Sequence, residues 1–126
     1  MLRFGTVVLN VQDLGRATAF WSAALGYEPV KPPEDDWATL GPRAGGAGPR
    51  VSLQLSDQDA PDVPHVHLDL YADDAADQAA EVERLVGLGA TRADWDHYPE
   101  GERDFIVLGD TEGNLFCIID TSFGAA

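Results

Sequence analysis

The chain has 126 residues, of which 44% are hydrophobic and 24% charged, so its length and composition are those of one soluble domain. Its formal net charge of −14 would repel a phosphate backbone or an anionic membrane surface. We therefore expect neither a nucleic-acid partner nor membrane attachment. Cys117 is the only cysteine and no apolar run reaches the roughly 18 residues of a bilayer span, so a cytoplasmic location is expected.

The first half of the chain predicts a strand, a helix and two further strands. The strand covers Thr6 to Val11. In the helix, Asp13 is a suitable N-cap, apolar residues recur at steps of three and four, and Gly26 provides a stop. The further strands are expected at Trp37–Leu40 and Val51–Leu55, and the Gly/Pro-rich stretch 41–49 between them predicts a turn or loop.

The second half has the same order of elements. After a linker at about 58–64, a strand is expected from Val66 to Tyr71. Asp73 or Asp74 can cap a helix that ends before Gly89. Further strands are predicted at Thr91–Trp95, Phe105–Leu108 and Leu115–Ile119.

These two halves align with a nearly constant offset, which indicates an internal repeat. Asp74 lies 61 residues after Asp13, and Gly89 lies 63 residues after Gly26. We therefore expect one α+β domain over residues 1–126, with one repeat at about 1–57 and the other at about 65–122. The two βαβββ repeats should form a curved, cup-like mixed sheet with both helices on its outer face.

Five segments carry a resemblance to a known superfamily. Segments 7–14, 19–28, 67–70, 88–90 and 109–116 together resemble the vicinal-oxygen-chelate pattern of glyoxalases, bleomycin-resistance proteins and ring-cleaving dioxygenases. The Phe116-Cys117 pair in the last strand is similar to that of a glyoxalase-like group. The resemblance implies a small-molecule ligand in a concave cavity and a homodimer.

Metal-dependent members of that superfamily carry two ligand positions in each repeat. The resemblance puts these positions on Thr6 and Gln54 in the first half and on His67 and Cys117 in the second. Threonine and glutamine are weak ligands and a cysteine replaces the expected carboxylate, so we expect no metal cofactor. If a divalent metal does bind, His67, Gln54 and Cys117 are its predicted ligands.

The alternation of side chains along a strand assigns residues to the two faces of the sheet. It places five polar residues on the concave face, namely Ser52, Gln54, His67, Asp69 and Cys117. It places five apolar residues under the helices, namely Leu53, Leu55, Leu68, Leu70 and Phe116. His67 is either a hydrogen-bonded cavity-wall side chain or a catalytic or binding group. Cys117 is either an inert buried thiol or a ligand-binding group.

Aromatic residues supply the remaining candidates for a binding site. Trp37, Trp95 and Tyr98 are expected to face the cavity, and His97 to lie at its mouth. The two tryptophans could equally fill the core or a dimer interface. Acidic residues flank both of them, and carboxylates beside aromatic rings suit a cationic ligand.

Three functions follow from these observations. The first is metal-independent binding of an aromatic or cationic small molecule by Trp37, Gln54, Asp69, Trp95, Tyr98 and Cys117. The alternative is a metal-dependent lyase or dioxygenase that uses His67 as its catalytic residue. The third is an interaction module whose cavity has lost its function.

Overall fold

The computed structural model describes residues 1–44, 46–96, 98, 101 and 103–124. The chain divides into two compact units, Met1–Ala60 and Pro61–Ala126, and their boundary falls inside the segment expected to be the linker. Among the described residues, no helix is long and apolar enough to cross a membrane.

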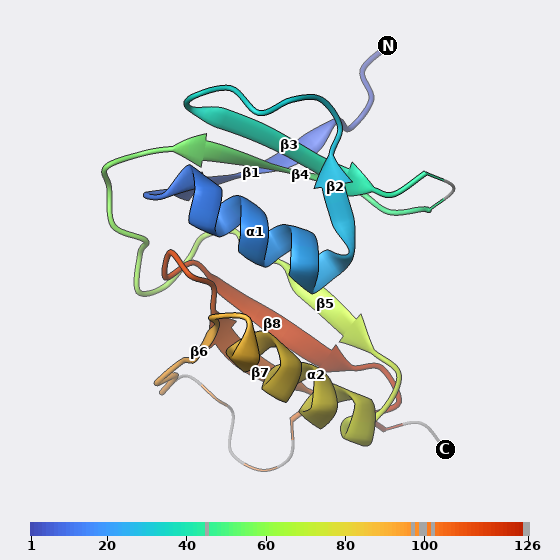
Figure 1. Ribbon diagram of the computed structural model, residues 1–126. Coiled ribbons are helices and arrows are strands. Elements are labelled where there is room, and N and C mark those ends of the chain that lie inside the picture. The colour runs from blue at the N-terminus through green and yellow to red at the C-terminus, as the bar shows by residue number, and fades with distance from the viewer. Residues whose placement is uncertain (45, 97, 99–100, 102, 125–126) are drawn as a thin grey trace. The chain divides into compact units, whose positions relative to one another are not determined.

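Both units have the same sequence of elements and the same sheet topology (Figure 1). The first unit consists of β1 (Thr6–Val11), α1 (Leu14–Leu25), β2 (Tyr27–Pro29), β3 (Trp37–Pro42) and β4 (Arg50–Leu55). The second consists of β5 (Asp69–Ala72), α2 (Ala75–Gly87), β6 (Thr91–Arg92), β7 (Phe105–Gly109) and β8 (Leu115–Asp120). The α+β class and the two βαβββ repeats are thus confirmed.

The described strands are hydrogen-bonded as two four-stranded sheets, with one sheet in each unit. Their orders are β1-β4-β3-β2 and β5-β8-β7-β6. In each sheet the first strand pairs in parallel with the last, and the other neighbours are antiparallel. A parallel pair requires a crossover connection, and the helix of each unit lies within that connection.

Local capping defines both helices. The Asp13 carboxylate accepts the backbone N–H of Arg16 at 2.9 Å, and Gly26 ends α1 with a φ of 66°. The Asp74 carboxylate accepts the N–H of Asp77 at 2.8 Å, and Gly89 follows α2 with a φ of 118°. Both predicted helices are confirmed, including their N-caps.

One face of each sheet packs under the helix of its own unit. In the first unit, Phe20 and Trp21 of α1 are both buried, with ring centroids 5.1 Å apart, and Leu53 of β4 is fully buried. In the second unit, Leu85 of α2 and Phe116 of β8 are buried. Because side chains alternate along a strand, this packing leaves the opposite face of each sheet for other roles.

A buried glutamine fastens α2 to its sheet. The Gln78 amide nitrogen donates to the carbonyl oxygens of Asp104 at 3.0 Å and Ile118 at 2.9 Å. A buried amide needs such partners, because an unpaired polar group costs free energy in an apolar surrounding.

The structure corrects several predicted details. β2 was not predicted, because its three residues are too few to show alternation and include Pro29. β5 begins at Asp69, so His67 precedes the strand, and β6 ends at Arg92, so Trp95 lies beyond it. Leu55, which was expected under a helix, is 43% exposed at the end of β4.

The turn between β7 and β8 depends on one buried carboxylate. Asp110 is 2% exposed, and its Oδ1 accepts the backbone N–H groups of Glu112 and Asn114, each at 2.8 Å. Gly113 has a φ of 84°, a value that favours glycine. The carboxylate therefore sets the geometry from which β8 starts.

We expect Asp110→Ala to lower the free energy of unfolding by about 2–3 kcal/mol, since two backbone donors lose a charged acceptor. Urea denaturation followed by circular dichroism measures this change. Asp62→Ala removes an exposed carboxylate from the same unit and should change the free energy by less than about 0.5 kcal/mol. Equal effects of the two substitutions would contradict the role assigned to Asp110.

Candidate functional site: a cavity in the second unit

The second unit contains a cavity of about 600 Å³ on the sheet face that lies opposite α2. Much of its wall is aliphatic or aromatic and includes Tyr71, Trp95, Phe105, Val107, Leu115 and Ile119. Four polar side chains share the wall, namely His67, Asp69, Asp104 and Cys117. Small-molecule sites in proteins have this combination of an apolar wall with a few convergent polar groups.

Strand register explains why these particular side chains meet. Asp69 of β5 and Val107 of β7 are the two neighbours of Cys117 across the sheet. Two residues further along, Tyr71 and Phe105 flank Ile119 in the same way. Since side chains two residues apart share a face, one row of three strands builds most of the wall.

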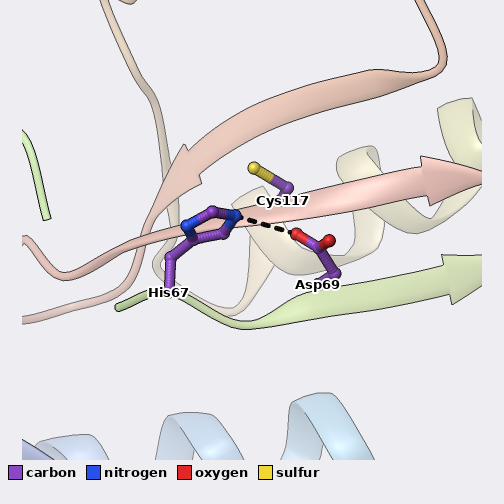
Figure 2. Close-up of side chains that lie close together, drawn as sticks. All are labelled: His67, Asp69 and Cys117. Atoms are coloured by element: carbon purple, nitrogen blue, oxygen red, sulfur yellow. Dashed lines mark ion pairs between the residues drawn. The ribbon is translucent and has the colours of Figure 1, made fainter. Parts of the chain in front are cut away.

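His67, Asp69 and Cys117 form a compact group on this wall. The His67 Nε2 lies 3.0 Å from the Asp69 Oδ1, and one donor atom from each of the three residues lies within 4.8 Å of the others. Figure 2 shows the three side chains pointing toward one another, from the segment before β5, from β5 and from β8. The His67 and Asp69 side chains are about half exposed, whereas Cys117 is buried.

The environment keeps the Cys117 thiol protonated. Burial, and then the negative charges of Asp69 and Asp104, raise the pKa of this thiol from its ordinary value of 9.0 to about 11. A cysteine nucleophile requires the opposite shift, toward the thiolate at neutral pH. In the metal-free protein, Cys117 is therefore a poor nucleophile.

Only some of the predicted site residues meet in this cavity. His67, Asp69, Trp95 and Cys117 line it. Tyr98 does not line the cavity. Its hydroxyl accepts the backbone N–H of Val107 at 2.8 Å. Its ring lies 5.2 Å from the ring of Phe105, and the Arg103 guanidinium lies over it. Tyr98 thus supports the edge of β7 from outside the cavity. His97 lies outside the described residues.

The two remaining candidates belong to the first unit. Trp37 starts β3, and its indole N–H donates to the Thr39 hydroxyl at 2.9 Å. Gln54 is exposed on β4, opposite Asn10 and Trp37. The cavity wall described above comes from the second unit alone and includes neither residue.

Sequence reasoning missed several wall residues. Tyr71 and Ile119 could have been found, because each lies two residues beyond a residue assigned to the concave face. Phe105 and Val107 required the pairing of β7 with β8, which the sequence does not give. Asp104, just before β7, had no local signal.

Comparison with known proteins identifies the chain's family. A sequence description of the glyoxalase-like domain matches residues 6–119, which is most of the chain. The chain belongs to the glyoxalase-like domain family. No curated protein matches it in sequence.

Several solved structures share the fold of this glyoxalase-like domain at low sequence identity. A glyoxalase-related enzyme from Fulvimarina pelagi is 16% identical with a TM-score of 0.70, covering 94% of this chain and 88% of that one. A glyoxalase/bleomycin resistance protein from Albidiferax ferrireducens is 21% identical with a TM-score of 0.62. The match covers 92% of this chain and 96% of that one. A variant of the fosfomycin resistance protein FosX from Listeria monocytogenes is 19% identical with a TM-score of 0.70. The match covers 94% of this chain and 90% of that one, and the variant was solved with Mn(II) and dihydroxypropylphosphonic acid.

The two repeats of this glyoxalase-like domain differ in chemistry at equivalent positions. With Asp13 and Asp74 aligned as N-caps, Thr6 corresponds to His67 and Val8 to Asp69. Val8 pairs with Ser52 as Asp69 pairs with Cys117, so Ser52 corresponds to Cys117. This register corrects the sequence alignment, which had placed Gln54 there.

Hydroxyl groups stand in the first repeat where the second has His67 and Cys117. The Ser52 hydroxyl lies 2.9 Å from that of Thr6 and 3.0 Å from that of Thr39, which also accepts the Trp37 indole N–H. Ser52 is fully buried. At these positions the first repeat therefore has hydroxyls that hydrogen-bond to one another, while the second has ionisable side chains.

We expect Cys117 to react slowly with iodoacetamide at pH 8, because only the thiolate reacts. A pKa of about 11 instead of 9.0 lowers the thiolate fraction roughly 100-fold, and burial slows the reaction further. The rate should rise with pH toward pH 11. Mass spectrometry of timed samples measures it.

Asp69→Asn removes one of the charges that raise this pKa, so it should accelerate the alkylation at pH 8. Asp62→Asn, outside the cavity wall, should not. Alkylation of the wild-type protein as fast as that of a small free thiol would show that the thiol is not held in its protonated form.

Proposed function

We propose that this chain binds a small molecule with an aromatic or aliphatic body and a positively charged group in the cavity of the second unit. The observation that carries the proposal is the cavity itself, whose largely apolar wall includes the carboxylates of Asp69 and Asp104. Its volume of about 600 Å³ lies within the range of ligand sites in proteins, roughly 300–1,000 Å³.

The apolar wall supports an aromatic body. Tyr71, Trp95 and Phe105 supply three rings to the same cavity. Tyr71 is 78% exposed, so its ring is available for contact with a ligand. Stacking on such rings and burial of apolar surface together favour a planar ligand.

The charge supports a cation over an anion. Asp69 and Asp104 line the cavity, and the described part of its wall carries no lysine or arginine. The net charge of −14 also draws cations toward the protein and repels anions. A phosphonate such as the one in the FosX structure would therefore be a poor ligand here.

Such binding needs no metal, because aromatic contacts and a carboxylate are sufficient to hold an organic cation. The alternative, a metal-dependent lyase or dioxygenase that uses His67, is favoured by one observation, namely the donor group of His67, Asp69 and Cys117. The hydroxyls of Thr6 and Ser52 at the equivalent positions argue against it, since neutral hydroxyls are weak metal ligands. We therefore favour binding as the function.

Tryptophan fluorescence tests whether the cavity takes an aromatic ligand. In the presence of EDTA, protonated naphthylmethylamine should quench wild-type fluorescence saturably, because Trp95 lines the cavity. Trp95→Phe should lose this saturable quenching, and Trp37→Phe should keep it. Unchanged quenching in Trp95→Phe would place the bound probe elsewhere.

Charge selectivity is the second test of the proposal. Asp69→Asn should weaken binding of the protonated amine by about three- to fivefold, since a half-exposed carboxylate contributes a modest Coulomb attraction. Binding of naphthylmethanol, which has the same ring and no charge, should change by less than about twofold. Titration by isothermal calorimetry measures both.

Asp62→Asn serves as the matched control for charge selectivity, because it removes the same charge from an exposed position outside the cavity wall. It should leave the affinity of both probes unchanged. Equal weakening of both probes by Asp69→Asn would show that the carboxylate acts on the shape of the cavity and not on the ligand's charge.

A further inference from the structure

Three side chains with different donor atoms converge on one wall of the cavity. They offer an imidazole nitrogen from His67, a carboxylate oxygen from Asp69 and a sulfur from Cys117, all within 4.8 Å of one another. Ligands held at about 2.0–2.3 Å around a tetrahedral ion lie roughly 3.3–3.8 Å apart. The His67 and Asp69 side chains are about half exposed, so their rotation can close the remaining difference.

From this convergence we propose that His67, Asp69 and Cys117 form a site for a thiophilic divalent metal, with Zn²⁺ as the fitting ion, built by the second repeat alone. The site lies on the wall of the cavity to which the proposed function assigns an organic ligand. It does not depend on that ligand, because its donors all come from the protein.

The donor set selects the kind of ion. Imidazole, carboxylate and thiolate are the three side-chain ligands that zinc uses, whereas Mn²⁺ and Mg²⁺ prefer oxygen. One carboxylate and one thiolate together carry two negative charges, which balance a divalent cation. Binding forms a metal–sulfur bond and breaks the S–H bond of Cys117, whose proton passes to the solvent, so no oxidant or reductant takes part.

The site departs from a pattern of two ligands per repeat. Thr6 and Ser52, the counterparts of His67 and Cys117, are hydrogen-bonded to each other at 2.9 Å. Asp69, whose counterpart in the first repeat is the apolar Val8, supplies the third ligand instead. The second repeat therefore provides all three donors from two adjacent strands and the segment before them.

Three protein ligands leave one tetrahedral position unfilled, as in zinc sites that bind a small molecule directly. Because all three donors line the cavity, an ion held between them borders it, and a ligand with an oxygen or sulfur donor fits the fourth position. An ammonium group beside Asp69 would occupy the same region, so the metal and an organic cation should compete.

Titration with Co²⁺, a spectroscopic substitute for Zn²⁺, tests the proposal on the full chain without a histidine tag. We expect one equivalent to bind and to produce a near-ultraviolet thiolate-to-cobalt charge-transfer band, which Zn²⁺ then abolishes by displacement. Mn²⁺ in the same excess should not displace the cobalt. Cys117→Ser should lose the band, and His67→Ala and Asp69→Asn should each weaken Co²⁺ binding at least about tenfold.

Ser52→Ala provides the matched control, because it alters the equivalent strand position in the first repeat and should retain both the band and the affinity. Circular dichroism confirms that each variant is folded. The proposal is overturned if wild-type protein shows no charge-transfer band, if folded Cys117→Ser retains it, or if Ser52→Ala loses as much affinity as His67→Ala.

The metal site and the proposed organic ligand can fail independently. Tryptophan quenching is measured in EDTA, where no metal is bound, and cobalt absorption is measured without an organic probe. Loss of the band with intact quenching rejects the metal site alone, and the reverse result rejects the organic ligand alone.

Discussion

The parallel pairing of the first and last strands in each unit is the constraint on which the rest of the structure depends. A parallel pair cannot be closed by a tight turn, so a longer connection links its two strands, and in each unit that connection begins with a helix whose apolar side covers one face of the sheet. The same pairing fixes the register in which Asp69 lies beside Cys117. Slippage of β8 by one residue would turn Cys117 into the core and Phe116 out of it. The burial of Phe116 in the second unit therefore also favours the register that holds Cys117 beside Asp69.

Much of the fold could be predicted because its signals are local. Asp13, Gly26 and Asp74 marked helix ends through backbone hydrogen bonds that each makes within a few residues. Strands β1 and β4 were placed within one residue from their apolar, β-branched composition, although their alternation is imperfect. The short strands were harder, because β2 and β6 are held by pairing with β3 and β7 rather than by their own sequence.

The candidate site could be predicted only for residues that were grouped within one repeat, without a comparison of the two repeats. His67, Asp69 and Cys117 share a face by alternation, so their grouping followed from the sequence once β5 and β8 were taken as neighbours. Gln54 was assigned through a fixed offset between the repeats, and the actual register places Ser52 there instead. Tyr98 illustrates a different limit, since an aromatic residue in a loop gives no sign of whether its hydroxyl closes a strand edge or faces a ligand.

The two repeats share one fold but differ in the side chains at equivalent strand positions. The hydroxyls of Thr6, Thr39 and Ser52 are neutral, and each has a hydrogen-bond partner within the first unit. In the second unit the buried thiol of Cys117 lies beside two carboxylates, which is unfavourable for forming its anion and favourable for holding an external cation. Burial and the two carboxylates together keep the thiol protonated, and the same two carboxylates are the charges on which the proposals of an organic or a metallic cation depend. Both proposals therefore rest on the side chains of the second repeat, whereas the equivalent side chains of the first repeat are engaged in hydrogen bonds or are apolar.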